Sequence, residues 1–283
     1  MSSEHSTTAS PTEVSPALVA RGVGLSFAGL RALDALDFDI PAGGTSAVIG
    51  PNGAGKTTLF NCVSGLYRYE GELLLDGRSL GRLRPHQRAQ LGIARTFQTP
   101  ALLDGESALQ NVALGAVAHS RVGVLDSMLS TPRRRREERE TLEQAFAVLD
   151  RFGIAGLAGR PVAGLAHGDR RRVEVARALM SRPSLLMLDE PAAGLGAEEA
   201  QDLLAEVEAH AGAATTVLLV EHDVALVMSV ARRVVVLDSG RLLAVGTPDE
   251  VRADPRVVQA YLGADDADQP APERLHATSE EQA

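Results

Sequence analysis

One octapeptide in the first quarter of the chain restricts the fold more than any other feature. Residues 50–57 read Gly-Pro-Asn-Gly-Ala-Gly-Lys-Thr, which satisfies the pattern G-x-x-x-x-G-K-[ST] at every fixed position. Residues 47–49 before it favour a strand, and residues 58–64 after it favour a helix. A glycine-rich turn between a strand and a helix predicts a loop whose backbone N–H groups point at phosphate oxygens.

The same octapeptide predicts roles for its polar side chains. Lys56 places a positive charge where the β- and γ-phosphates of a nucleoside triphosphate would lie, and the Thr57 hydroxyl is a ligand for Mg²⁺. The other residues expected around the phosphates are Asn52, Gly53, Ala54, Gly55 and Thr58. We therefore expect the chain to bind ATP or GTP. A chance glycine-rich turn is the alternative, and the flanking strand and helix disfavour it.

A second apolar run ends in two adjacent acids. Residues 185–188 have the pattern of a buried strand, and Asp189 and Glu190 follow directly. Beside a phosphate loop, such a pair predicts a metal and water site, in which Asp189 holds Mg²⁺ and Glu190 polarises the attacking water. Taken alone, the two acids could equally cap the turn before Pro191. The presence of Lys56 favours the catalytic interpretation.

Composition excludes several classes of function. The 283 residues carry a formal net charge of −9, so the chain offers no basic surface for a nucleic-acid backbone. Its single cysteine, Cys62, cannot form an internal disulfide and has no neighbours spaced for a metal. No run approaches the roughly 18 apolar residues of a membrane-spanning helix, and residues 1–17 lack a signal-peptide core. We expect any membrane contact to come through another subunit.

Strand-like runs alternate with longer amphipathic stretches, which indicates an α/β fold with a largely parallel sheet. The runs are residues 47–49, 73–75, 185–188, 217–220 and 234–237. From about 99 to 161 the strand signals stop, and the spacing of Leu142, Phe146 and Leu149 predicts a helix over 137–152. We expect a helical subdomain here, extended by a loop and helix at 162–180.

Both ends of the chain are polar. Residues 1–16 and 264–283 have too few apolar side chains to form a core, and we expect both tails to be disordered. Ahead of the second tail, Thr247-Pro248 and Asp254-Pro255 each place a capping residue before a proline suited to a first helical turn. Two short helices should therefore close an ordered domain that spans 17–263.

The order of these motifs resembles the ABC transporter ATPase family over nearly the whole ordered chain. The resemblance implies a P-loop NTPase fold with a RecA-like core sheet, an antiparallel β subdomain and a helical insert. It implies that Phe27 stacks on adenine, that Gln98 acts in catalysis by reaching Mg²⁺ and leads into the helical insert, and that His222 contacts the γ-phosphate. Without the family, Phe27 would be interpreted as a strand core residue and His222 as a surface histidine.

Residues 165–169 lie where the family has its L-S-G-G-Q loop, which completes the nucleotide site of the opposite subunit. The loop residues implied to contact that nucleotide are Leu165, Ala166, His167 and Gly168. Ala166 replaces the serine and Asp169 the glutamine, so a hydroxyl donor is lost and an acid is placed near a phosphate. Gly196 stands where the family usually has Asp or Asn. These departures concern the site completed on the partner, not the site built on Lys56.

Within the family, residues 92–98, the long insert and the ending 246–263 are similar to the branched-chain amino acid importer group. The resemblance implies a peripheral ATPase at the cytoplasmic face of the membrane that energises uptake of branched-chain or other hydrophobic amino acids. The implied partners are a second ATPase, which the altered loop indicates is unlike this one, two integral-membrane permeases and, indirectly, an extracytoplasmic binding protein. An importer of urea or amides, a partly degenerate regulatory subunit and a soluble ABC protein outside transport remain alternatives.

Residues 133–136 are four consecutive arginines, the longest basic run of the chain. A solvated face or loop of the helical insert is the favoured interpretation. Contact with lipid headgroups is the alternative.

Overall fold

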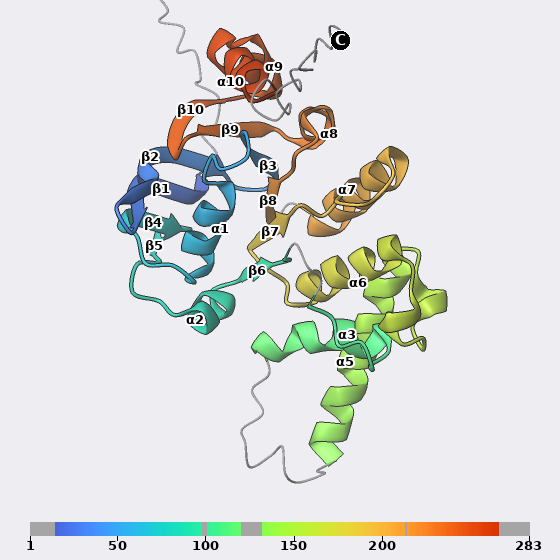
Figure 1. Ribbon diagram of the computed structural model, residues 1–283. Coiled ribbons are helices and arrows are strands. Elements are labelled where there is room, and N and C mark those ends of the chain that lie inside the picture. The colour runs from blue at the N-terminus through green and yellow to red at the C-terminus, as the bar shows by residue number, and fades with distance from the viewer. Residues whose placement is uncertain (1–14, 98–100, 120–131, 213, 266–283) are drawn as a thin grey trace, which may run out of the picture.

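Two β-sheets and a group of helices make up the described part of the chain, residues 15–97, 101–119, 132–212 and 214–265 of the computed structural model (Figure 1). Helices and parallel strands alternate along the larger sheet, and the smaller sheet is antiparallel. The predicted α/β class is therefore confirmed.

The larger sheet has six strands in the order β10-β9-β3-β8-β7-β6. Their bounds are Gly44–Ile49 for β3, Ile93–Arg95 for β6, Leu185–Asp189 for β7, Thr216–Val220 for β8, Arg233–Asp238 for β9 and Arg241–Gly246 for β10. Only β10, which is antiparallel to β9, departs from parallel pairing. Strands β7 and β8 are buried along their whole length, which explains their unbroken apolar runs.

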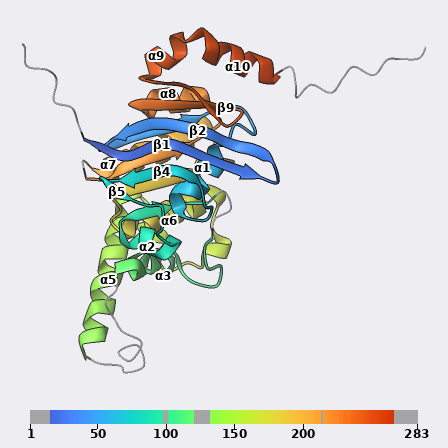
Figure 2. The ribbon, with the colours of Figure 1, turned by 90° about the vertical axis from the view of Figure 1, so that its left-hand side faces the viewer.

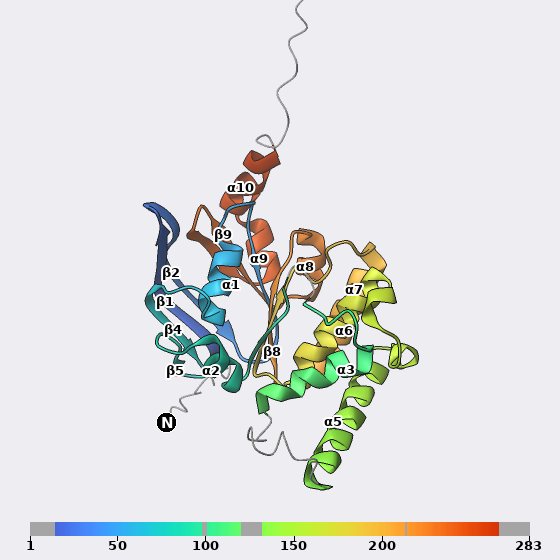
Figure 3. The ribbon, with the colours of Figure 1, turned by 60° about the horizontal axis from the view of Figure 1, so that its bottom comes forward.

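The smaller sheet has the order β2-β1-β4-β5. Its strands are β1 (Pro16–Phe27), β2 (Leu30–Pro41), β4 (Glu70–Leu75) and β5 (Arg78–Ser79). Helix α1 (Lys56–Ser64) lies between the two sheets (Figure 3), and Leu59, Phe60 and Val63 of α1 share one core cluster with residues from both. The helix that begins at the glycine-rich loop is therefore fixed on two sides.

The guanidinium of Arg88 anchors the far end of α1. Arg88 belongs to α2 (Pro85–Gln90), is 2% exposed, and donates to the carbonyl oxygens of Val63 at 2.8 Å and Leu80 at 2.7 Å. It also donates to the carbonyl oxygens of Cys62 and Leu83. Carbonyl groups at a helix end lack partners within the helix, and Arg88 supplies them.

The helices divide into three groups. The predicted helical segment contains α3 (Ala108–Ala113), η1 (Leu114–His119), α5 (Pro132–Arg151), η2 (Ala155–Leu157), η3 (Val162–Gly164) and α6 (His167–Met180), on the side of the sheet beyond β6 (Figures 1 and 3). Helices α7 (Ala197–Ala211) and α8 (Val224–Val230) connect the central strands. Helices α9 (Pro248–Ala253) and α10 (Pro255–Asp265) lie beside β10, at the opposite end of the molecule from α5 (Figure 2).

Two helix predictions can be compared with the structure in detail. The helix expected over 137–152 is present as α5, but Phe146 is 47% exposed. The buried stripe runs instead through Ala145, Leu149 and Phe152, because this is the face that α5 turns toward α3 and α6. The two proline-started helices near the end are α9 and α10, and the Thr247 hydroxyl caps α9 by accepting the Glu250 N–H at 3.3 Å.

Several predicted residues and boundaries lie at or beyond the ends of the described ranges. Most of each predicted tail, residues 1–14 and 266–283, lies outside the described residues, as does Gln98. Strand β1 begins at Pro16 and α10 ends at Asp265, so ordered elements extend slightly past the predicted limits of 17 and 263. None of the helices in the described ranges is both long and apolar enough to cross a membrane.

Candidate functional site

Three parallel strands end at one edge of the six-stranded sheet and bring most of the predicted site together. The glycine-rich loop follows β3, Glu190 follows β7, and His222 comes just after β8. A pocket of about 590 Å³ opens there. Its walls contain residues 52–58, Glu190 and His222, together with Leu30, Arg31 and Ala32 of β2 and Ser239 and Gly240.

The backbone of the loop requires glycine at two points. Gly55 has φ 101°, and a Cβ there would lie 2.9 Å from the Ala32 carbonyl oxygen. A Cβ at Gly50 would lie 2.1 Å from the carbonyl oxygen of Leu237, so no side chain fits. Helix α1 begins at Lys56 without a side-chain cap. The N–H groups of its first turn are therefore available to an anion, which the helix dipole also attracts.

The Lys56 side chain folds back onto its own loop. Its Nζ donates to the carbonyl oxygens of Gly50 at 2.6 Å and Pro51 at 3.0 Å. Lys56 is 6% exposed, and this burial lowers its pKa, while the charges of Glu190 and Asp189 act in the opposite direction. Lys56 is also the only lysine in the sequence. The loop backbone thus holds the cation beside the start of α1.

Asp189 has one oxygen occupied and one without a partner. Its Oδ2 accepts from the Arg95 guanidinium at 2.7 Å, in an ion pair whose two side chains are 2% and 6% exposed. The Asp189 N–H donates to the Thr96 hydroxyl at 3.2 Å. The Oδ1 atom is buried and accepts no hydrogen bond. No motif in the sequence singled out Arg95, although it lies in the segment 92–98 that supported the family resemblance.

Glu190 and His222 form a pair across two strand ends. The Nε2 of His222 lies 2.6 Å from Oε1 of Glu190. Glu190 has φ 51°, a conformation that non-glycine residues rarely adopt and that is concentrated at functional sites. Its N–H donates to the Val220 carbonyl at 2.9 Å, which joins the turn after β7 to the end of β8. His222 is half-exposed and open to the pocket.

Glu221 links the turn that follows β7 to the turn that follows β8. It was not predicted as a site residue from the sequence. It is 5% exposed, and its carboxylate accepts the N–H of Ala192 at 2.7 Å and that of His222 at 3.2 Å. Burial raises the pKa of Glu221, and the two N–H donors oppose that rise. One buried side chain therefore positions the backbone on both sides of the Glu190 and His222 pair.

Phe27 does not line this pocket. It ends β1, is 43% exposed and meets the Tyr67 ring edge to face, with ring centroids 5.2 Å apart. The exposure contradicts the alternative of a strand core residue. Its predicted contact with adenine stays a prediction.

The loop 165–168 also lies away from the pocket. Ala166 is the N-cap of α6 and makes no side-chain cap, and Nε2 of His167 lies 2.9 Å from the Ala193 carbonyl oxygen. The four loop residues therefore do not join Lys56 within one chain.

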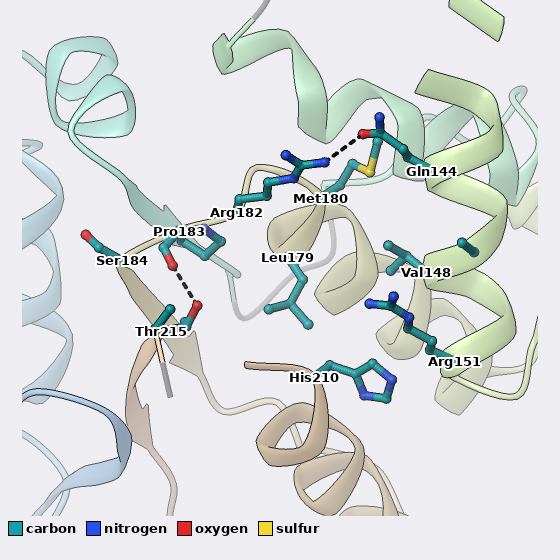
Figure 4. Close-up of a pocket in the computed structure, with 12 residues that line it drawn as sticks. Gln144, Val148, Arg151, Leu179, Met180, Arg182, Pro183, Ser184, His210 and Thr215 are labelled. Atoms are coloured by element: carbon teal, nitrogen blue, oxygen red, sulfur yellow. Dashed lines mark hydrogen bonds between the residues drawn. The ribbon is translucent and has the colours of Figure 1, made fainter. Parts of the chain in front are cut away.

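Another pocket, of about 400 Å³, lies at the start of β7 and β8, among α5, α6 and α7 (Figure 4). Arg182 in its wall donates to Gln144 at 3.2 Å, and Arg151 and His210 complete one side. None of the predicted phosphate, metal or water residues lines it. The pocket at the carboxyl ends of the strands is therefore the candidate nucleotide site.

Comparison with known proteins agrees with this geometry. The family model described as ABC transporter matches residues 33–193, and a second model, branched-chain amino acid ATP-binding cassette transporter, matches residues 241–267. The chain is 41% identical over 250 residues to the high-affinity branched-chain amino acid transport ATP-binding protein BraF of Pseudomonas aeruginosa, covering 88% of this chain and 98% of BraF. It is 40% identical over 252 residues to the corresponding protein LivG of Escherichia coli, with the same coverage.

Solved structures show the same fold. The ADP conformation of an ATP-binding cassette of an ABC transporter superposes with a TM-score of 0.76 at 28% identity, over 88% of this chain and 99% of that one. A nucleotide-free cassette gives the same TM-score and identity, over 87% and 99% of the two chains. The chain thus belongs to the ABC transporter family, as an ATP-hydrolysing subunit.

Proposed function

We propose that this subunit hydrolyses ATP at the cytoplasmic face of the membrane to drive import of branched-chain amino acids. The observation that carries the cargo assignment is the match of residues 241–267 to the branched-chain family model, in the segment that forms β10, α9 and α10. The names of the relatives BraF and LivG support the same assignment. An importer of urea or amides is the alternative, and uptake measurements with labelled substrates distinguish the two.

The residues around Asp189 fit a magnesium ion. Its buried Oδ1 accepts no hydrogen bond, and Thr57 is an exposed residue in the first turn of α1 that lines the pocket. No group of three acidic, histidine or cysteine side chains in the described residues could hold a metal alone. Mg²⁺ commonly takes one or two protein ligands and completes its shell with phosphate oxygens and water. When bound, the ion would neutralise charge on the β- and γ-phosphates, with Gln98 as a further proposed ligand.

Phosphoryl transfer to water requires positioning and charge neutralisation more than covalent chemistry. In the proposed arrangement, the loop N–H groups and Lys56 hold the phosphates, and Glu190 polarises the attacking water. His222 fixes the Glu190 carboxylate through their 2.6 Å contact and faces the γ-phosphate. Glu221 keeps both turns in place by its bonds to Ala192 and His222. A preformed arrangement of this kind lowers the reorganisation needed in the transition state.

The position of the 165–169 loop supports a head-to-tail pair of subunits. The loop lies at the start of α6, outside the pocket of its own chain, where it can complete the site of a partner. Ala166 brings no hydroxyl to that site, and Asp169 brings an acid into the first turn of α6. We infer an unlike partner with an intact loop, so that the site built on Lys56 carries most of the turnover.

Large exposed hydrophobic side chains before and within the helical segment are candidates for contact with membrane subunits. Phe97, Leu103, Leu114 and Val117 are large hydrophobic side chains between 42% and 63% exposed. They lie just after β6 and around α3 and η1. Where exposed apolar side chains form a contiguous patch, they mark a protein interface. We propose that two permease subunits contact this part of the chain, through which motion in the ATPase pair reaches the transport path and, indirectly, the extracytoplasmic binding protein.

Replacing His222 by alanine tests the hydrolytic arrangement. The variant should lose the fixed orientation of Glu190, so kcat should fall by about 100-fold or more while ATP affinity changes little. Steady-state ATPase assays and calorimetric titrations measure the two quantities. His86→Ala, at an exposed position on α2, is the matched control and should behave as the wild type. A normal kcat in His222→Ala would assign the role to another residue.

Uptake of labelled amino acids tests the cargo. In cells that lack this gene, the wild-type chain should restore import of leucine, isoleucine and valine. Glu190→Gln keeps the side-chain shape but removes the base, so it should restore none. Glu138→Gln, at an exposed site on α5, serves as the control and should restore import. Restored uptake of urea or amides without that of branched-chain amino acids would refute the cargo assignment.

Repair of the altered loop tests the unlike pair. A homodimer of this chain should be a poor ATPase, because both of its sites would be completed by Ala166 and Asp169. The double substitution Ala166→Ser with Asp169→Gln restores a donor and removes an acid, so it should raise the homodimer rate severalfold. Adding Glu190→Gln should abolish the gain. An unchanged rate in the repaired homodimer would mean that the departures are neutral.

A further inference from the structure

We propose that Arg95 is a positioning residue for magnesium, which fastens the Asp189 carboxylate to α1 and leaves one carboxylate oxygen for the ion. The inference deepens the proposed function, because it rests on the assignment of Asp189 as a Mg²⁺ ligand. It assigns Arg95 no contact with the nucleotide. Four observations on the described residues carry it.

The Arg95 guanidinium joins three elements of the fold. From β6 it donates to Oδ2 of Asp189, at the end of β7, at 2.7 Å. It also donates to Oδ1 of Asn61 at 2.7 Å and to the hydroxyl of Ser64 at 3.1 Å, both on α1. A single side chain therefore ties the end of β7, where Asp189 lies, to the helix that follows the phosphate loop.

The two anchors on α1 lie on the same face as the proposed second ligand of the ion. Thr57, Asn61 and Ser64 are spaced four and three residues apart, and side chains with this spacing line one face of a helix. Arg95 binds this face one and two turns beyond Thr57. The Asp189 carboxylate is thereby held against the face of α1 that presents the Thr57 hydroxyl.

The two carboxylate oxygens of Asp189 differ in their partners, and the difference supports a bound ion. Arg95 occupies Oδ2, whereas Oδ1 is buried and accepts no hydrogen bond. Buried acceptors are nearly always satisfied, and one that is not calls for an explanation such as an ion. A buried carboxylate also needs a compensating charge, which Arg95 supplies. The pair is thus arranged so that the metal can take Oδ1 without displacing the arginine.

The guanidinium is also held by aromatic rings on two elements. Its central carbon lies 5.5 Å from the ring centroid of Phe60 on α1 and 5.0 Å from that of Phe97, which follows β6. Such contacts orient a flat guanidinium better than they orient an ammonium group. Lysine at this position would keep the charge, but it could not reproduce the fork that reaches Asp189, Asn61 and Ser64 together.

The substitution Arg95→Lys separates positioning from simple charge compensation. The experiment measures ATP affinity by calorimetry, first in EDTA and then over a series of Mg²⁺ concentrations, with the full chain. Mg²⁺ should increase ATP affinity above its value in EDTA. In Arg95→Lys, the Mg²⁺ concentration that gives half of this increase should be ~10-fold higher than in the wild type, which corresponds to about 1.4 kcal/mol. ATP affinity in EDTA should stay within ~2-fold of wild type, because the phosphate loop is untouched. Mn²⁺ with ADP, followed by electron paramagnetic resonance, should show the same weaker metal binding without turnover.

Arg88→Lys is the matched control. Arg88 is likewise a buried arginine that anchors α1, but its partners are backbone carbonyls and none is Asp189. This variant should lower thermal stability and leave the Mg²⁺ requirement unchanged. A second variant, Asn61→Ala with Ser64→Ala, removes the two α1 anchors and keeps the ion pair. It should shift the Mg²⁺ requirement in the same direction by a smaller factor, and it provides the test if Arg95→Lys does not fold.

The outcomes distinguish this inference from the function beneath it. If wild-type affinity does not depend on Mg²⁺, the metal role of Asp189 is wrong and the inference falls with it. If wild-type affinity depends on Mg²⁺ but Arg95→Lys and the double variant Asn61→Ala with Ser64→Ala both keep the wild-type Mg²⁺ requirement, only the positioning role of Arg95 is overturned. Equal losses of affinity in EDTA and in Mg²⁺ would likewise reduce Arg95 to a structural residue. Tighter metal binding in Arg95→Lys would show that the arginine competes with the ion.

Discussion

The nucleotide site depends on one buried cation, the Lys56 ammonium, held by the carbonyl oxygens of Gly50 and Pro51. An ammonium removed from water needs partners, and the loop supplies them from its own backbone. The same two contacts shape the loop around the space for the phosphates. Burial lowers the pKa of Lys56, and the carboxylates of Asp189 and Glu190 restrain that shift. We propose that the β- and γ-phosphates of a bound nucleotide replace these carbonyl groups as partners of the ammonium.

Parallel strand order brings the remaining chemistry to this cation. Because β3, β8 and β7 are neighbours in the sheet, residues far apart in the sequence meet where the strands end. Buried polar side chains then fix what the backbone brings together. Glu221 joins the turns that carry Glu190 and His222, and Arg95 joins Asp189 to α1. These contacts tie together the strand ends at the edge of the pocket, whereas residues 165–169 do not line it.

Features that are local in sequence could be predicted, whereas those created by packing could not. The loop around Lys56 and the acids Asp189 and Glu190 follow from continuous motifs, and the parallel sheet follows from its apolar runs. Arg95 contacts Asp189 across 94 positions of sequence, and no pattern around either residue indicates the pair. The apolar spacing predicted that Phe146 would face the core, but α5 turns the face with Ala145 toward its neighbours and leaves Phe146 exposed. The predicted buried face was therefore shifted by one residue.

The most direct measurement of the central claim uses the fact that Lys56 is the only lysine in the sequence. Protein labelled with ¹⁵N-lysine carries a single labelled side-chain amine, whose nuclear magnetic resonance signal reports on the phosphate loop alone. Addition of ATP with Mg²⁺ should shift this signal saturably, because the amine exchanges carbonyl partners for the β- and γ-phosphates. AMP, which lacks those phosphates, should leave it nearly unchanged. An equal shift with AMP, or no shift with ATP, would contradict the account.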